Sequence, residues 1–427
     1  MRVVVWGINY APEFTGIAPH SVALCEFLER EGHDVEMLTT FPYYPTWQKR
    51  SEDRGRLYRT DVINGVSVHR CWHFVPARVS AIKRIVHEAS FVFSSTLRAL
   101  FLAQPDVFVV VSPPLLLGAA AWFVGKLKRA PYVFHVQDMQ PDAAVGLGML
   151  KRSWFTRALY ALEAFAYQHS ARVSGITRGM LKTFRRKGVP ESKLIYFPNA
   201  IELKNDEPRP ARGEFRQSHG FPAHQFLAIY AGNLGVKQGL EVLLETAALL
   251  RNKPIHFLIC GDGAQREALA AHAREMQLPN FNMLPLQRGR DYRALLVDAD
   301  LCFITQQAGA GNSFFPSKLL GLLAESKPVV TVAAPECELA LSLAEGNFGV
   351  NVPPGKPEEL ATLLDSLAND PERLWIYGAS GRRYVEQFEK QRVMQSFVAE
   401  LKSCLIGAAR RNDQVHESAQ DDSALER

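Results

Sequence analysis

The chain has 427 residues, of which 47% are hydrophobic, 22% charged and 10% aromatic. This composition is typical of folded domains with a core, and it excludes a disordered chain, a coiled coil and a small disulfide scaffold. The net charge of +5 is uneven, because residues 1–210 carry 27 Lys and Arg against 18 Asp and Glu and the rest carries 22 against 26. The basic first half predicts an anionic partner, and without a nucleic-acid-binding motif we favour a membrane surface or a phosphorylated substrate over nucleic acid.

The predicted elements repeat one order, in which a short apolar strand is followed by a loop and an amphipathic helix. The clearest ones lie at residues 2–8, 21–31, 35–39, 226–230, 240–251, 255–260 and 264–276. Short apolar strands that alternate with helices predict parallel sheets covered on both faces. Residues 199–213 are charged and proline-bearing, and we interpret them as the linker between two such domains.

Two apolar stretches of the first half bear on membrane contact. Residues 107–124 are interrupted by Ser112-Pro113-Pro114, so they predict a strand, a turn and a helix rather than a membrane span. Residues 78–102 are helical in pattern, basic at their start and rich in Phe, Leu and Ile. This pattern fits an interfacial helix on an anionic leaflet, and it fits a helix packed inside the protein equally well.

The cysteines and the N-terminus indicate the compartment. Six cysteines are scattered without a C-x-x-C pair, which predicts reduced, buried thiols in a cytoplasmic protein. The first residues enter an apolar run directly, so we expect no signal peptide. His69, Cys71 and His73 alternate along a strand, but no fourth ligand follows, and we expect no metal.

Glycine-rich loops between a strand and a helix are the strongest chemical signal. One contains Gly16, and the other contains Gly232, Asn233 and Lys237. Such loops let backbone amides approach a diphosphate, and a lysine adds a point charge. The alternative for each is a glycine that only shapes a turn. Gly261-Asp262-Gly263 is too short a signal to stand alone.

Two further stretches combine polar groups at element ends. Ser313, Ser317 and Lys318 surround Pro316 at a predicted helix start, where amides and an amine would hold an anion. His135, Gln137 and Asp138 lie at the end of a predicted strand. A histidine beside an acid at such a place predicts a hydroxyl-binding or proton-relaying site, whereas a lone histidine is more often a core residue.

Five stretches together resemble the retaining sugar transferases of glycosyltransferase family 4, and most of all the colanic-acid and O-antigen type. They are Gly-Ile-Asn-Tyr-Ala-Pro-Glu-Phe-Thr-Gly at 7–16, Pro-Tyr-Tyr-Pro-Thr-Trp at 42–47, His-Val-Gln-Asp at 135–138, Gly-Asn-Leu-Gly-Val-Lys-Gln-Gly-Leu at 232–240 and Pro-Ser-Lys at 316–318. The resemblance implies the α/β GT-B fold, in which two Rossmann-like domains face each other across a cleft.

The resemblance also implies a separate function for each domain. Residues 1–205 would bind the acceptor and residues 206–388 the nucleotide sugar, while 389–410 would form a helix that packs back on the first domain. The tail 411–427 is polar, and we expect it to be disordered.

The resemblance further implies roles for individual residues. His135, Asp138 and Lys237 would be catalytic, with Lys237 neutralising the departing diphosphate. The donor would be bound by Gly16, Gly232, Asn233, Lys237, Gly261, Asp262, Ser313, Ser317 and Lys318. The acceptor would contact Glu13, Tyr43, Tyr44 and Gln137. Family members work without a divalent ion, so we expect neither metal nor cofactor.

The chain departs from the family pattern at three places. The family usually has two glutamates eight positions apart, and this chain has Ser313 and Gly321 there. The basic residue often found four positions before the lysine is Asn233. Gln137 stands at the family's histidine position, with His135 two residues earlier.

We therefore predict a retaining glycosyltransferase of cell-surface polysaccharide biosynthesis. It would use a UDP- or GDP-type sugar and a polyprenyl-diphosphate-linked or saccharide acceptor, at the cytoplasmic face of the inner membrane. No covalent nucleophile is evident, so we expect front-face attack in which the leaving phosphate takes the acceptor's proton. The alternatives are another GT-B enzyme, such as a nucleotide-sugar epimerase, and a membrane-associated subunit of weakened activity.

Overall fold

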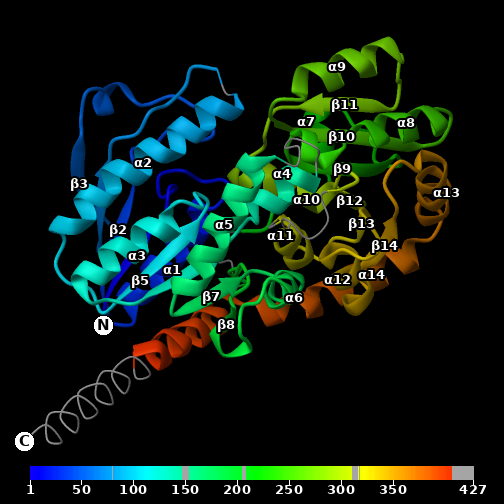
Figure 1. Cartoon of the computed structure of the whole chain (residues 1–427). Helices are drawn as coiled ribbons and strands as arrows, with labels where there is room; N and C mark the ends of the chain where they lie inside the picture. Colours follow the sequence, from blue (N-terminus) through cyan, green and yellow to red (C-terminus); the bar gives the residue numbers. More distant parts are fainter. Residues whose placement is uncertain (79, 147–152, 204–207, 310–315, 317, 406–427) are drawn as a thin grey trace, which may run out of the picture. The chain divides into compact units, whose positions relative to one another are not determined.

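The computed structural model describes residues 1–427 except 79, 147–152, 204–207, 310–315, 317 and 406–427. The chain divides into two compact units, each built around a sheet (Figure 1). The first unit contains Met1–Pro141, the described part of Lys151–Asn199 and the segment that begins at Gln391, and the second contains the described parts of Asp142–Leu150 and Ala200–Lys390.

The first unit has a sheet in the order β3-β4-β2-β1-β5-β6-β7-β8. Its strands are β1 (Arg2–Trp6), β2 (Asp34–Thr40), β3 (Tyr58–Ile63), β4 (Val66–Cys71), β5 (Val107–Ser112), β6 (Tyr132–Val136), β7 (Arg172–Gly175) and β8 (Leu194–Tyr196). Its helices are α1 (Ala18–Arg30), α2 (Ala81–Phe101), α3 (Leu117–Lys128), α5 (Trp154–His169) and α6 (Arg178–Arg186). Helix α4 (Gln140–Gly146) follows β6, and its residues from Asp142 onward belong to the second unit. The strands are parallel except β3, which pairs antiparallel with β4.

The residues of the first unit explain these elements. Every residue of β5 is buried, as expected for a central parallel strand that is covered on both faces. Helix α2 begins after Ser80, whose hydroxyl accepts a hydrogen bond from the backbone N–H of Lys83, and Ser153 and Thr177 cap α5 and α6 in the same way. Such caps satisfy amides that have no partner in the first turn of a helix.

The second unit has a sheet in the order β11-β10-β9-β12-β13-β14, with all pairs parallel. Its strands are β9 (Phe226–Asn233), β10 (Ile255–Asp262), β11 (Phe281–Leu284), β12 (Leu301–Thr305), β13 (Val329–Val332) and β14 (Gly349–Val352). Its helices are α7 (Glu214–His219), α8 (Glu241–Leu249), α9 (Arg266–Glu275), α10 (Gly289–Asp298), α11 (Lys318–Ala324), α12 (Glu338–Gly346), α13 (Pro357–Ala368) and α14 (Pro371–Tyr384).

Two hydrophobic cores lie on opposite faces of this second sheet. Leu227 and Ile229 of β9 belong to one core, and Ala228 and Tyr230 belong to the other. Successive side chains of a strand point to opposite faces, so helices must cover both sides. The apolar runs of the sequence thus predict the layering, and the predicted element bounds differ from the observed ones by at most a few residues.

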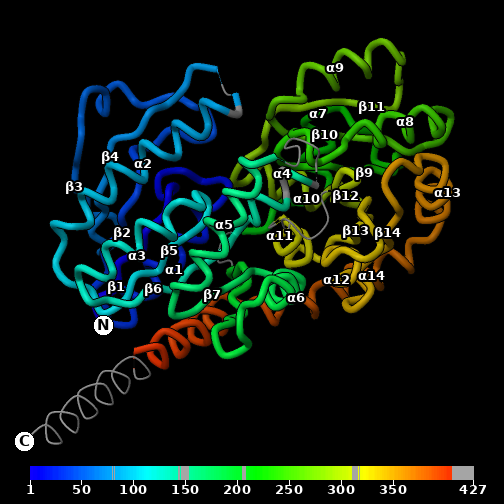
Figure 2. The backbone as a smooth tube through the Cα atoms, viewed as in Figure 1, coloured from blue at the N-terminus to red at the C-terminus, as the bar shows by residue number. Residues whose placement is uncertain are grey.

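The segment after Gln391 packs on the first unit. It is helical in the described residues up to 405, and Phe397 stacks on Phe197 directly after β8, with ring centroids 3.8 Å apart and planes 6° apart. Figure 1 labels β8 beside this red segment, which Figure 2 traces as a red tube.

The apolar stretch 107–124 forms strand β5, a turn and helix α3, as predicted. Within the described part of the chain, no helix is both long and apolar enough to cross a membrane.

Each sheet has one place where the order of its strands reverses. In the first unit it lies between β1 and β5, and in the second it lies between β9 and β12. In open parallel sheets, ligands bind at the carboxyl ends of the strands at this switch point. The loops after these four strands therefore define the candidate site in each unit.

Candidate active site

In the second unit, the carboxyl end of β9 lies beside the start of α11, the helix that follows β12. The amine of Lys318 lies 3.4 Å from the ring centroid of Tyr230 and 3.4 Å from the carbonyl oxygen of Ala231. Gly232 is next to both, because a Cβ added to it would lie 3.6 Å from Cδ and 3.7 Å from Nζ of Lys318. The amine of Lys318 therefore lies at the switch point, and Gly232 leaves one side of it free of a neighbouring side chain.

The other glycines of this edge serve close packing of the backbone. A Cβ on Gly261 would lie 2.0 Å from the carbonyl oxygen of Gly232, and one on Gly263 would lie 2.6 Å from that of Leu234. Asp262 is exposed, and its carboxylate accepts a hydrogen bond from the Gly263 amide at 2.8 Å. Glycine is thus required at 261 and 263 by the neighbouring strand.

Lys237 lies in a short 3₁₀ turn, Val236–Gln238, that follows β9. Its carbonyl accepts a hydrogen bond from the backbone N–H of Gln307 at 2.9 Å, so the loops after β9 and β12 are joined. Gly239 ends the turn with a φ of +58°, a value that favours glycine. The exposed side chain of Asn233 lies at the start of this loop.

The predicted residues of the β12–α11 loop can be placed only in part. Ser313 and Ser317 lie outside the described residues. Gly321 lies in α11, and a Cβ there would meet no atom within 4 Å. The position of the family's second glutamate is therefore sterically open.

In the first unit, Glu13 joins the loops after β1 and β2. One carboxylate oxygen accepts hydrogen bonds from the backbone N–H groups of Tyr43 and Tyr44 at 2.9 and 2.8 Å, and the other accepts from Asn9 Nδ2 at 2.7 Å. Glu13 is buried, and burial raises its pKa. The predicted acceptor residue is therefore engaged in holding the loops.

Tyr43 is part of a buried aromatic cluster with Trp47, His73 and His87. The ring centroids are 4.6–5.4 Å apart among neighbours. His87 Nδ1 donates to the carbonyl of Phe74 at 2.5 Å, and burial lowers the pKa of His87 to about 4. Tyr43 thus packs in this cluster as a core residue of the loop that follows β2.

Tyr44 and Asp138 keep partly exposed side chains at this edge. Burial raises the pKa of the Tyr44 phenol, and Arg84, Glu13 and Asp138 are all close enough to act on it. A Cβ on Gly16, which has a φ of +66°, would lie 3.6 Å from the Tyr44 ring. Of the predicted acceptor residues, Tyr44 is partly exposed, whereas Glu13, Tyr43 and Gln137 are buried.

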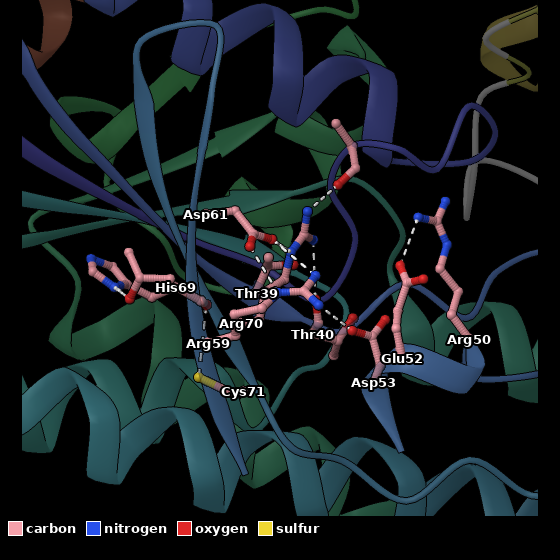
Figure 3. Close-up of polar contacts among 12 residues, drawn as sticks. Thr39, Thr40, Arg50, Glu52, Asp53, Arg59, Asp61, His69, Arg70 and Cys71 are labelled. Carbon is pink, nitrogen blue, oxygen red and sulfur yellow. Dashed lines mark hydrogen bonds and ion pairs between the residues drawn. The ribbon is translucent and has the colours of Figure 1, made fainter. Parts of the chain in front are cut away.

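A buried charge network braces the same loops from the edge of the sheet (Figure 3). Arg70 donates to Asp61 at 3.1 Å, to the Thr40 carbonyl at 3.2 Å and to the Ala11 carbonyl. Arg59 joins Asp61 to Asp53. Thr40 ends β2 and Ala11 lies in the loop after β1, so this network fixes the two loops that Glu13 also joins.

His135 is inside the first unit, with 2% of its surface exposed. Its Nδ1 lies 2.9 Å from Ser174 Oγ, and its Nε2 lies 2.8 Å from Gln137 Nε2, which also donates to Asn199 at 3.0 Å. Burial lowers the pKa of His135 to about 3, so the ring is neutral and accepts the hydrogen bond from Gln137. Both ring nitrogens are occupied by protein, and Asp138 is the group of this stretch with partial exposure.

No group of three His, Cys, Asp or Glu side chains that could hold a metal ion occurs among the described residues. His69 lies 2.8 Å from Glu36 and 3.1 Å from Thr60. Asp298 and Asp300, which have the spacing of a metal-binding pair, precede β12 and so lie away from the carboxyl edge. They bind Arg216 and backbone amides.

The comparisons with known proteins agree with this architecture. Residues 15–200 match the family model of a glycosyl transferase 4-like domain, and residues 211–384 match that of glycosyl transferases group 1. The chain is 32% identical over 411 residues to the putative colanic acid biosynthesis glycosyl transferase WcaI of Escherichia coli K12, covering 94% of this chain and 100% of that protein.

The chain belongs to glycosyltransferase family 4.

Two solved structures align with nearly the whole chain. Sucrose-phosphate synthase from Thermosynechococcus elongatus aligns with a TM-score of 0.74 at 16% identity, over 95% of this chain and 99% of that one. HepE of Anabaena, solved with UDP-glucose, aligns with a TM-score of 0.68 at 14% identity, over 94% and 100%. The predicted GT-B fold is confirmed.

Three residues of this glycosyltransferase were missed by the sequence analysis. Tyr230 appeared as an apolar strand residue, although its ring meets the Lys318 amine. Arg70 and Arg84 appeared only as part of the basic first half. An arginine inside a β-branched strand pattern, Val66–Cys71, was the available signal for Arg70, whereas nothing in the sequence pairs Tyr230 with Lys318.

Proposed function

We propose that this glycosyltransferase moves a sugar from a UDP- or GDP-type nucleotide sugar to a lipid-linked saccharide during cell-surface polysaccharide synthesis. The observation that carries the donor half is the amine of Lys318 at the β9/β12 switch point, where no carboxylate of the described residues compensates its charge. A departing diphosphate needs this kind of stabilisation. Lys237, in the adjoining loop, would supply a second positive charge.

The proposed reaction retains the configuration of the sugar. The bond from the anomeric carbon to the diphosphate oxygen breaks, and the bond to the acceptor oxygen forms on the same face. The acceptor's proton passes to a leaving phosphate oxygen. We assign Asp138 and Tyr44 to the acceptor, and we assign His135 the task of holding Gln137 toward the edge of the sheet. The lysines replace a metal ion in this scheme, so EDTA should leave turnover unchanged.

The donor proposal is tested by binding first. Thermal unfolding is measured with UDP-, GDP- and dTDP-sugars, and one nucleotide class should raise the midpoint. Transfer of a radiolabelled sugar to a polyprenyl-diphosphate-linked saccharide is then assayed, and the anomer of the product is determined by NMR. Release of free sugar without acceptor would instead indicate an epimerase, and binding of no nucleotide sugar would indicate a non-catalytic subunit.

The acceptor proposal rests on an apolar and basic face of the first unit. Along α2, Phe93, Leu97 and Phe101 follow one another at a spacing of four residues, with Phe93 69% and Phe101 83% exposed. Such a spacing places side chains on one face of a helix. The neighbouring α3 adds exposed Phe123 and Leu127.

Cations accompany these apolar side chains. Lys83 and Arg84 on α2 and Lys126 on α3 are exposed. Apolar side chains with basic neighbours are typical of a surface that rests on anionic lipid. We propose that α2 and α3 hold the enzyme on the leaflet that carries its lipid-linked acceptor.

The membrane proposal is tested by co-sedimentation with phosphatidylglycerol vesicles. The wild type should bind at low salt and be released at high salt, and Phe93→Asp with Phe101→Asp should abolish binding. Trp375→Asp is the matched control, because Trp375 on α14 is 73% exposed but belongs to the second unit. Equal loss of binding in control and double variant would overturn the assignment to α2.

A further inference from the structure

The surroundings of the Lys318 amine are unusual for a lysine. Its amine meets the Tyr230 ring and the Ala231 carbonyl, each at 3.4 Å. The Tyr230 hydroxyl is turned away, because it donates to the Asn233 carbonyl at 2.8 Å. The amine is thus enclosed by an aromatic face and one neutral acceptor, and within the described chain it forms no ion pair.

The groups that face the amine carry no charge at neutral pH. Tyr230 faces it from β9, and burial raises the pKa of its phenol. Cys302 acts on it from β12, and burial raises the pKa of this thiol to about 12. The sequence from 310 to 317, which leads into α11, contains no acidic residue. Among the described residues of the second unit, Lys318 therefore has no ion-pair partner.

Burial lowers the pKa of Lys318 to about 7. An enclosed amine without a counter-ion loses the hydration that stabilises its charged form, and an approaching anion restores that form. The electrostatic attraction of an aromatic face compensates only part of this loss. Lys318 in the ligand-free protein is consequently balanced between its neutral and charged forms.

We propose that Lys318 takes up a proton as the donor's diphosphate binds, so that the ligand itself generates the charge that later stabilises the leaving group. The lone pair of the amine nitrogen accepts the proton from the buffer, and the ammonium then donates to phosphate oxygens without forming a covalent bond. This inference rests on the proposed function, because it places the diphosphate at Lys318.

Gly232 and Tyr230 have defined parts in this arrangement. Gly232 has a φ of +143° and leaves the space beside Nζ free of a side chain. Tyr230 is a positioning residue, since its ring holds the amine at the end of β9 without neutralising it. A carboxylate in place of the ring would compete with the diphosphate for the same cation.

The experiment is calorimetric titration of the full-length enzyme with UDP at pH 8 in HEPES and in Tris. The two buffers have different ionisation enthalpies, so the difference in measured heat gives the number of protons taken up. With a pKa of about 7 for the free amine, the wild type should take up about 0.9 proton per UDP. At this pH the phosphates of UDP are already ionised and contribute nothing.

Variants assign the proton to its group. Lys318→Arg keeps a permanent charge and should bind UDP with uptake near zero. Lys318→Met should also show no uptake and should bind UDP about tenfold more weakly or worse. Tyr230→Phe is the matched control, because it retains the ring that encloses the amine and should keep the uptake of the wild type. Thermal unfolding of each variant verifies that the fold is intact.

The outcomes separate this inference from the proposed function. Binding of UDP by the wild type without proton uptake would overturn the inference alone, as would an uptake that persists in Lys318→Arg. If neither UDP nor GDP binds, the proposed donor site fails and the inference fails with it.

Discussion

In the second unit, the amine of Lys318 meets an aromatic ring and one carbonyl, whereas in the first unit the carboxylate of Glu13 accepts three hydrogen bonds and Arg70 lies between Asp61 and two carbonyls. Both places lie at loops next to a switch point. The charges of the first unit are satisfied by the protein and hold loops together. The amine of Lys318 in the second unit lacks a charged protein partner, and we expect a ligand to provide one.

This difference separates two uses of a buried polar group. A buried polar group whose hydrogen-bond partners all belong to the protein contributes to the free energy of unfolding. Removing one partner leaves the remaining groups buried and unpaired, which destabilises the folded state. A buried cation without a partner does not stabilise the folded state, and its favourable effect is expected in binding and turnover. The comparison therefore predicts which substitutions change stability and which change activity.

The largest expected effect on stability is at Arg70. Arg70→Met removes a buried guanidinium that bonds Asp61 and the carbonyls of Thr40 and Ala11, and it should lower the free energy of unfolding by about 3 kcal/mol in urea titrations. Arg2→Met is the control, because its ion pair with Asp34 is partly exposed and should change the free energy of unfolding far less. Similar losses in both variants would contradict the role of the Arg70 network.

For Lys318, the large effect is expected on activity rather than on stability. Lys318→Met should reduce the rate constant of sugar transfer about 100-fold, the loss typical of removing a group that stabilises developing charge. Its free energy of unfolding should not fall below that of the wild type, because burial lowers the pKa of Lys318 and so disfavours folding with this amine charged. Lys253→Met, which removes an exposed ion pair with Asp365, should leave transfer unchanged. A loss of stability in Lys318→Met without a loss of transfer would show that Lys318 serves the fold rather than the reaction.

The buried His135 should make the free energy of unfolding depend on pH. The pKa of His135 is about 3 in the folded protein, whereas an unfolded histidine titrates near 6.5. Below pH 6.5 the unfolded chain therefore binds a proton that the folded one excludes, and the contribution of His135 to stability falls as pH falls toward 3.

His135→Asn removes this titration. The stability advantage of the wild type over this variant should shrink by about 1.4 kcal/mol between pH 7.5 and 5.5, measured by urea unfolding. The exposed His224 provides the control, and the effect of His224→Asn on the free energy of unfolding is measured at the same pH values. A constant difference for His135→Asn would mean that its ring is charged in the folded protein.

The smallest effect is expected at Gly321, where the family usually has a glutamate. A Cβ would meet no atom within 4 Å, and Gly321 lies inside α11. Gly321→Ala should therefore raise the free energy of unfolding by about 0.5–1 kcal/mol. Gly261→Ala is the contrasting variant, because its Cβ would lie 2.0 Å from the Gly232 carbonyl oxygen and should destabilise the protein. Destabilisation by both would show that α11 is crowded.

The layers of both units and the glycine-bearing loops at the ends of their strands were predictable from the sequence. Apolar runs such as β5 are buried along their whole length, and only a central parallel strand explains such a run. Lys318 was identified from Pro316 and the helix start that follows it, because these signals are local. Burial of all six cysteines was predicted as well.

Contacts between distant residues could not be predicted. Tyr230 and Lys318 are 88 positions apart in the sequence, and their contact depends on the order of β9 and β12 in the sheet. The same holds for His135, whose strand-end position indicated a ligand contact. Its neighbours Ser174 and Phe197 come from later parts of the chain, and they make it a buried, fully bonded residue.

The most direct test of the account compares UDP with uridine as ligands, by calorimetry on the wild type and on Lys318→Met. If Lys318 receives the diphosphate, the wild type should bind UDP at least about 100-fold more tightly than uridine, and the variant should lose at least tenfold of that preference while its affinity for uridine is unchanged. An equal preference for UDP in both proteins would contradict the account.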